Sequence, residues 1–203
     1  MSSIVSLKEI PCFKSTYFTN PLFSAIIGNV NHHHEMCKEA NQWGCIGFSS
    51  GCIERKDCVI LASYQVQKES GDVTFKLHGN TTEDKYIALA ISEDSKMGDD
   101  GVIACYQSSS NGPGIVVSWN SQYKDSEIIT SYHMDHLLAN PSTTYENGML
   151  ECEFTLRKEW RVPKPDKSNG VNYDLSQPYF LHLAKGSVSK DNKKPWFKLD
   201  YHE

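Results

Sequence analysis

Apolar residues in this chain gather in short runs, which polar, glycine-containing segments separate. The run at residues 86–91 is apolar throughout, and the run at 101–106 is nearly so. Short runs that are rich in β-branched and aliphatic residues and bounded by Gly, Asp and Ser are typical of strands in a sandwich core. The two runs therefore predict a hairpin, and its polar loop carries Met97. A thioether in such a loop serves as a core filler or as a soft metal ligand.

The same criteria predict further strands at residues 59–66, 73–78, 115–120, 149–156 and 178–186. Strands at short intervals, with turn-rich loops and almost no helical period, favour an all-β antiparallel sandwich. We expect residues 160–173, which contain two prolines, to form a long loop. Residues 128–138 fit a strand and a helix equally well, so His133, Met134 and His136 are expected on a partly buried rim.

Alternation within two of these strands predicts which side chains enter the core. Phe75 and Leu77 share one face of their strand, so we expect His78 on the solvent side. In residues 149–156, Cys152 belongs to the apolar set. Cys105 ends another apolar run, so a disulfide between Cys105 and Cys152 is the first pairing that we expect.

The length of 203 residues suits one all-β domain. Residues 1–44 lack a clean period, so we expect a partly ordered N-terminal arm followed by a sandwich domain over residues 45–203. The net charge of −5, without a basic block, excludes nucleic acid as a partner. No apolar run approaches the ~18 residues of a membrane helix, and the N-terminus lacks the apolar segment of a signal peptide. We expect a soluble chain without direct membrane insertion.

The cysteine content indicates an oxidising compartment. The disulfide candidates are Cys37, Cys45, Cys52, Cys58, Cys105 and Cys152, and Cys12 is the candidate for the unpaired thiol of an odd set. The spacings between Cys45, Cys52 and Cys58 differ from those of zinc knuckles, so they favour a disulfide-stapled loop over a metal site. Asn80, in Asn-Thr-Thr, is a glycosylation candidate.

Two polar clusters resemble metal sites without predicting one. The three histidines at residues 32–34 are adjacent, and neighbouring side chains point apart in a helix and in a strand. Asp94, Asp99 and Asp100 share one loop and would attract a hard cation such as calcium. We expect these acids to be solvated instead.

No motif of a hydrolase or transferase is present in the sequence, which lacks Gly-x-Ser-x-Gly, His-Glu-x-x-His and a phosphate-binding glycine loop. At most we expect one-electron redox chemistry. Aromatic side chains that would contact a glycan or a protein are Trp119, Tyr123, Trp160 and Trp196.

Several segments together resemble one family. They are the cysteine-rich loop, Val73-Thr-Phe-Lys-Leu, Tyr86-Ile-Ala-Leu-Ala-Ile-Ser-Glu-Asp-Ser-Lys-Met-Gly-Asp-Asp-Gly-Val-Ile-Ala-Cys, Glu146-Asn-Gly-Met-Leu-Glu-Cys-Glu-Phe and Tyr179-Phe-Leu-His-Leu-Ala-Lys-Gly. In this order they resemble a DOMON domain, most similar to the ferric-chelate reductase 1-like branch, over residues 45–203. The chain departs from that pattern at Tyr86, where the family usually has Trp, and at residues 158–173, which look like an insertion.

The resemblance implies an immunoglobulin-like β-sandwich that, in cytochrome members, binds haem b between a methionine and a histidine. Met97 falls on the methionine position, and His202 is the first candidate for the histidine. His182 is the second choice, because it alternates with Phe180 and Ala184 inside a strand. Imidazole and thioether ligands together favour reduced iron, as suits one-electron transfer.

Two hypotheses for function follow. The first is an extracellular module, located outside the cell or in the secretory lumen, that binds a ligand, a glycan or another protein. The alternative is a haem-b electron-transfer domain of a ferric-chelate-reductase-like system, for which the resemblance implies a membrane cytochrome as partner.

Overall fold

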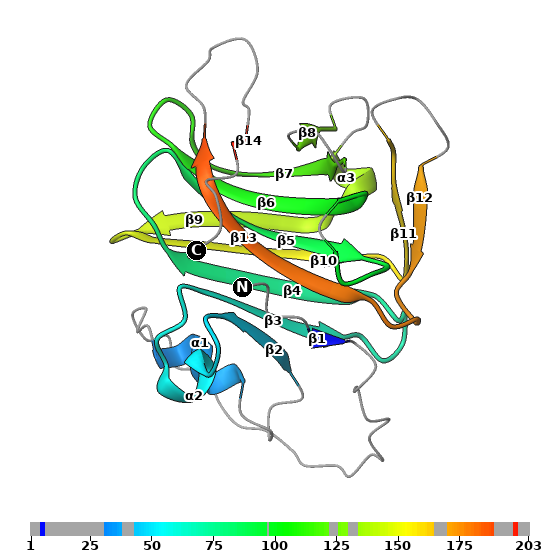
Figure 1. The fold of residues 1–203 in the computed structure, drawn as a ribbon, viewed down its shortest axis with the longest axis horizontal. Helices are drawn as coiled ribbons and strands as arrows, with labels where there is room; N and C mark the ends of the chain where they lie inside the picture. Colours follow the sequence, from blue (N-terminus) through cyan, green and yellow to red (C-terminus); the bar gives the residue numbers. More distant parts are fainter. Residues whose placement is uncertain are drawn as a thin grey trace.

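The computed structural model describes residues 5–6, 31–37, 43–96, 98–121, 126–129, 134–164, 170–188 and 197–198 of the chain. These residues form two antiparallel sheets that pack face to face, with a separate two-stranded hairpin at one end (Figure 1). The expected all-β, disulfide-stabilised sandwich is confirmed. No helix in the described part of the chain is long and apolar enough to cross a membrane.

The larger sheet, called sheet A below, contains the hairpin that the sequence predicts. Its strands, in order across the sheet, are β1 (Val5–Ser6), β13 (Phe180–Val188), β5 (Lys85–Ser92), β6 (Asp100–Ser108), β7 (Gly112–Asn120) and β8 (Glu127–Ile128). A short strand, β14 (Phe197–Lys198), pairs with β13. Within the hairpin, Ile91 of β5 lies opposite Gly101 of β6, so the loop that connects them begins at the end of both apolar runs.

The smaller sheet, called sheet B, packs on the inner face of sheet A. Its strands, in order, are β2 (Gly44–Phe48), β3 (Ile60–Val66), β4 (Val73–Asn80), β10 (Met149–Leu156) and β9 (Ala139–Glu146). The sequence did not predict β9, which begins Ala-Asn-Pro-Ser, because those residues are depleted in strands. Strand β9 lies at the edge of sheet B, where Pro141 can stand without interrupting the hydrogen bonds between strands.

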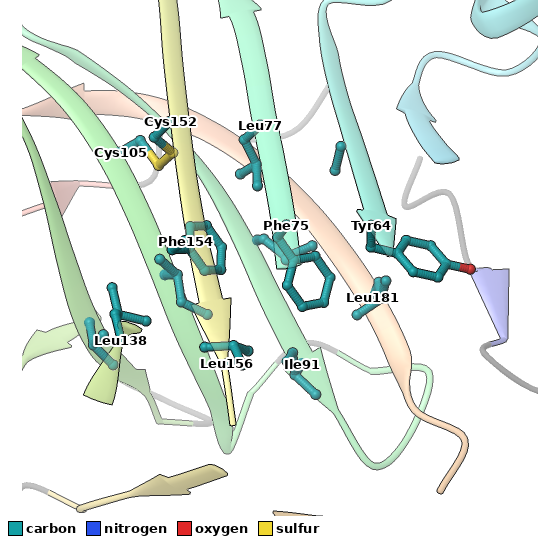
Figure 2. Packing of buried hydrophobic residues seen from close by; sticks show 14 of the residues in the cluster. Tyr64, Phe75, Leu77, Ile91, Cys105, Leu138, Cys152, Phe154, Leu156 and Leu181 are labelled. Atoms are coloured by element: carbon teal, nitrogen blue, oxygen red, sulfur yellow. A yellow bond between two sulfur atoms is a disulfide. The ribbon is translucent and has the colours of Figure 1, made fainter. Parts of the chain in front are cut away.

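Large apolar side chains from the two inner faces fill the core. Ile87, Leu89 and Ile91 of β5 are fully buried there. Phe75 and Phe154 of sheet B stack with ring centroids 5.6 Å apart (Figure 2). The alternation that the sequence shows in residues 149–156 is thus the alternation between core and outer face.

Three disulfides lie within the described residues: Cys37–Cys45, Cys52–Cys58 and Cys105–Cys152. The Cys105–Cys152 bond joins β6 to β10 and so crosses the core between the two sheets (Figure 2). This is the pairing that the sequence favoured. The other two bonds lie at strand β2 and at helix α2 (Cys52–Arg55). We expected only a disulfide-stapled loop in this region. Cys12 lies outside the described residues.

The segment that the sequence assigned to a long loop contains a hairpin instead. Strands β11 (Glu159–Val162) and β12 (Val171–Asp174) pair with each other, and Trp160 packs on Tyr173 with ring centroids 5.3 Å apart. Trp160 Nε1 donates to the carbonyl oxygen of Leu137 at 2.9 Å, next to helix α3 (Met134–Leu137). The hairpin therefore closes one end of the core.

The aromatic residues proposed as surface contacts are part of this core where the structure describes them. Trp119 is 3% exposed and Trp160 is 2% exposed, so these two candidates are core residues and not surface contacts. Tyr123 and Trp196 lie outside the described residues.

His78 also differs from its expected place on the solvent side. It is 5% exposed, because helix α1 (Asn31–Met36) covers the outer face of sheet B at this point. His34 of that helix packs edge-on against His78, with ring centroids 6.1 Å apart. An element that lies outside the predicted sandwich thus buries a face that strand alternation assigns to solvent.

Tyr173 predicts a loss of stability at alkaline pH. Its hydroxyl accepts a hydrogen bond from the Gly101 N–H at 2.9 Å, and burial raises the pKa of Tyr173. Because the folded-state pKa lies above the unfolded value of about 10, the stabilisation is complete below about pH 10 and is lost as the pH rises further. We expect the free energy of unfolding to fall above about pH 10 and Tyr173→Phe to reduce that fall.

Urea unfolding on both sides of about pH 10 measures the effect. Tyr145→Phe is the control, since Tyr145 is only half-buried and its hydroxyl contacts the Thr81 carbonyl at 3.4 Å. An unchanged pH dependence in Tyr173→Phe would contradict the assignment.

Candidate functional site

One face of sheet A points away from the sandwich core and carries small side chains. Along β5, Ile87 and Leu89 enter the core, while Tyr86, Ala88 and Ala90 point to the opposite face. These three residues are nevertheless at most 6% exposed. Both faces of this strand are therefore buried, which explains why its sequence is apolar at every position.

The strand register arranges these small residues in rows across sheet A. One row, read from β13 to β7, consists of Ala184, Ala88, Ala104 and Val116. The next row consists of His182, Ala90, Val102 and Ser118. Because cross-strand partners lie on the same face of a sheet, the two rows form one largely apolar floor. Their short side chains leave space above it.

A pocket lies over this floor. Its enclosed volume is about 30 Å³, and it is partly open to solvent. Tyr86 forms part of its wall. Its polar lining consists of Ser118, Asn120, Ser126 and His182. The Ser126 hydroxyl donates to the Ser118 hydroxyl at 2.7 Å, so these two groups satisfy each other.

His182 is the buried titratable side chain of this pocket. It is 2% exposed, and its Nε2 donates to the backbone carbonyl oxygen of Asp94 at 3.4 Å. The other ring nitrogen, Nδ1, is buried and has no hydrogen-bond partner among the residues that the structure describes. Leaving such an atom unpaired costs about 1–3 kcal/mol, so its position suggests a ligand.

The loop between β5 and β6 lies beside His182. Asp94 and Asp99 are exposed, as expected of solvated acids, but Asp100 is 1% exposed and departs from that expectation. Burial raises the pKa of Asp100, against the opposing effect of hydrogen bonds from the Ser92 side chain and the Gly98 backbone. Asp100 is therefore a buried acid at the edge of the pocket.

The ligand pair that the resemblance suggests is not described directly. Met97 and His202 both lie outside the described residues, so their assignment stays a prediction. His182, the second choice, lines the pocket. Asn80 is exposed at the end of β4, where a glycan would be accessible.

The other histidines whose side chains the structure describes, His34, His78 and His136, are not part of the pocket lining. His34, on α1, is buried, and His136 is exposed on α3. Within the described residues, no group of three or more His, Cys, Asp or Glu side chains is arranged to bind a metal ion.

The sequence makes His182 only the second choice of ligand, because a histidine inside a strand is usually a side chain of the sheet surface. The signal that points to its place in the pocket is the size of its neighbours on the same face. Alanines alternate with large aliphatic residues in β5, so one face of the sheet is built to leave space. His182 and Ala184 continue that face on β13.

The donor set of the pocket limits its chemistry. Among the described residues, its lining combines one imidazole, hydroxyl and amide groups, and apolar walls. Such a set suits the binding of a largely apolar group through one nitrogen ligand.

Comparison with known proteins agrees with the fold. The sequence profile of the DOMON domain matches residues 56–186. The chain belongs to the DOMON domain family. The match includes β5, β6, β7 and His182, which contribute to the lining of the pocket of this DOMON domain.

Relatives of the domain carry one kind of name. A protein of Drosophila melanogaster named "Putative ferric-chelate reductase 1 homolog" is 28% identical over 164 residues, which cover 78% of this chain and 23% of the relative. "Putative ferric-chelate reductase 1" of Xenopus laevis is 26% identical over 160 residues, 74% of this chain and 24% of its own length. The protein of the same name from Danio rerio is 22% identical over 144 residues, 71% and 22% of the two lengths. The matched region thus spans about a quarter of these relatives.

Proposed function

We propose that this DOMON domain binds haem b in the pocket on sheet A, with His182 as an axial ligand, and acts as a one-electron transfer domain. The observation that supports the proposal most directly is the buried Nδ1 of His182, which has no hydrogen-bond partner. Imidazole nitrogen is a common axial ligand of haem iron. A haem group would also supply the apolar contact that the alanine rows lack.

The surroundings of His182 offer a haem group an apolar floor and one imidazole donor. A flat macrocycle needs a low apolar surface, which Ala88, Ala104 and Ala184 provide. The Nε2 of His182 donates to the Asp94 carbonyl, and a contact of this kind fixes the tautomer and orientation of a ligating imidazole. The same contact leaves Nδ1 as the unprotonated nitrogen.

Met97 is the second axial ligand in this proposal. Its neighbours Lys96 and Gly98 belong to the loop whose Asp94 carbonyl contacts His182. Between an imidazole and a thioether, haem would supply a one-electron couple that favours the reduced iron. The residues of the chain would bind the group, orient the imidazole and exclude water.

We place this function outside the cell or in the secretory lumen, because three disulfides are typical of oxidising compartments. The relatives named as ferric-chelate reductases suggest a ferric chelate as the terminal electron acceptor. A membrane cytochrome is the proposed redox partner. This chain matches about a quarter of the length of these relatives. The proposed partner would correspond to the parts of the relatives that this chain does not match.

An absorption spectrum of the protein purified under mild conditions tests the proposal. We expect a low-spin spectrum with six-coordinate iron, and Ala104→Leu should abolish it, because the larger side chain fills the pocket floor from the outer face of β6. Ser142→Leu, on the exposed edge strand β9, is the matched control and should keep the wild-type spectrum.

A colourless protein that also fails to bind added haemin would contradict the proposal. That result would favour the other hypothesis, in which the domain binds a small ligand, a glycan or a protein. Screening against glycans and candidate proteins would then be the next measurement.

A further inference from the structure

We propose that Ser118 and Asn120 form a carboxylate subsite at the edge of the pocket opposite His182, so that the pocket selects an apolar ligand with an acid group. The inference rests on the pocket of the proposed function and adds a second point at which that pocket holds its ligand. Haem b is a ligand of this class, since its macrocycle is largely apolar and carries propionate carboxylates at one edge. The residues of the subsite lie within the described part of the chain.

The strand register separates the subsite from His182. Successive cross-strand partners on β13, β5, β6 and β7 are His182, Ala90, Val102 and Ser118. Neighbouring strands lie about 4.8 Å apart, so the backbones of His182 and Ser118 are about 14 Å apart across the sheet. The side chains between them, Ala90 and Val102, are apolar. A ligand that contacts both polar ends must therefore have an apolar body.

Asn120 is a buried polar side chain of the pocket. It is 7% exposed, and it belongs to the pocket lining. Within the described residues, its side-chain amide makes no hydrogen bond. The amide nitrogen carries N–H donors, and burial of a donor without an acceptor is unfavourable. The unused donors of Asn120 favour a ligand that supplies an acceptor oxygen.

Ser118 adds a second donor on the same face of β7. It is 1% exposed, and in its contact with Ser126 it is the acceptor, at 2.7 Å. A hydroxyl also has a hydrogen to donate, and that of Ser118 has no acceptor among the described residues. Two donors at one edge suit a carboxylate, whose oxygens accept several hydrogen bonds. Such charge-assisted bonds are about twice as strong as neutral ones.

Asp100 is the charged residue beside the subsite, because it is the cross-strand partner of Asn120. Its carboxylate accepts from the Gly98 N–H at 2.8 Å and from the Ser92 side chain. These contacts leave the Asn120 amide to the ligand. Burial raises the pKa of Asp100, which favours the neutral acid and so limits its repulsion of a ligand carboxylate.

Two substitutions remove the donors one at a time. Asn120→Leu replaces the amide by an apolar group of similar size, and Ser118→Ala removes the hydroxyl. Asn172→Leu is the matched control, because Asn172 is exposed on β12 and is not part of the pocket lining. Urea unfolding verifies that each variant folds. Where Asn120→Leu does not fold, Ser118→Ala decides the inference.

The first measurement compares the binding of haemin and haemin dimethyl ester by absorbance titration. The ester caps the acid groups and removes their charge, while the macrocycle and the iron are unchanged. We expect the wild type to bind haemin roughly tenfold more tightly than the ester, because hydrogen bonds to a charged group are lost. Asn120→Leu and Ser118→Ala should each reduce this preference to about threefold or less, and Asn172→Leu should retain it. A wild type without the preference, or folded pocket variants that keep it in full, would overturn the inference and leave the proposed haem site standing.

The second measurement applies where the wild type binds neither form of haem, a result that refutes the proposed function. Dodecanoate then tests the subsite alone in the haem-free protein, with dodecanol as the matched alcohol and calorimetry as the readout. We expect dodecanoate to bind roughly tenfold more tightly than dodecanol, and Asn120→Leu to remove that difference. Absence of dodecanoate binding, or equal affinity for the acid and the alcohol, would overturn the inference.

Discussion

Replacing His182 by alanine is expected to leave the purified protein without haem. The substitution removes the imidazole that lines the pocket and whose Nδ1 has no hydrogen-bond partner. Removing a group that hydrogen-bonds to a metal ligand lowers metal affinity about 10- to 100-fold. Removing the ligand itself should therefore weaken haem binding by roughly a hundredfold or more. The fold should persist, because His182 faces away from the sandwich core. Haemin titration followed by absorbance measures the loss, and unfolding in urea verifies the fold.

Two other histidines serve as controls for this experiment. His136→Ala changes an exposed residue on α3 and should bind haemin like the wild type. His202→Ala tests the position that the family resemblance favours. Haem retained in His182→Ala but lost in His202→Ala would contradict the assignment made from the pocket and return the ligand to the C-terminal segment.

Removing the disulfide that crosses the core should have the largest effect on stability. Cys105 and Cys152 are separated by 47 residues, and closing a loop of that length lowers the entropy of the unfolded chain by the equivalent of about 4 kcal/mol. We expect replacement of both by alanine to lower the free energy of unfolding by about that amount. Equilibrium unfolding in urea measures it.

The Cys52–Cys58 bond provides the matched control. It spans only 6 residues, so its removal should cost about 2.2 kcal/mol on the same entropic basis. Losses of equal size for the two pairs would contradict the explanation by loop length. Neither double substitution should prevent haemin binding where the protein is folded, since Cys105 points into the core and its neighbour Ala104 points into the pocket.

Strands that form the core could be predicted because their residues repeat the pattern of the sheet. The runs that became β5 and β6 are apolar at nearly every position, and β10 alternates cleanly. Cys105 and Cys152 stand within these runs, so their pairing was accessible as well. In each case the local pattern and the tertiary environment agree.

Where the prediction failed, a distant segment decides the environment. His78 is buried because α1 lies over it, and Trp160 is buried because its hairpin folds onto the end of the core. Alternation within a strand does not reveal whether another segment of the chain covers its outer face. The same is true of Asp100, whose burial depends on the way its loop folds back toward Ser92.

The pocket was only partly predictable for a related reason. Met97 stands out as a thioether in a polar loop, but His182 looks like any polar residue of a strand. Its place in the pocket becomes visible only when the register sets it beside Ala90 and next to the alanine row. Register is a property of paired strands, and a single strand does not reveal it.

The alternation along β5 gives the two faces of this strand different roles. Ile87, Leu89 and Ile91 stabilise the fold, whereas Ala88 and Ala90 shape the pocket. Substitutions on the second face therefore alter what the domain accepts without opening a void in the core. The pocket can therefore be enlarged or filled one residue at a time while the core that holds the two sheets together stays intact.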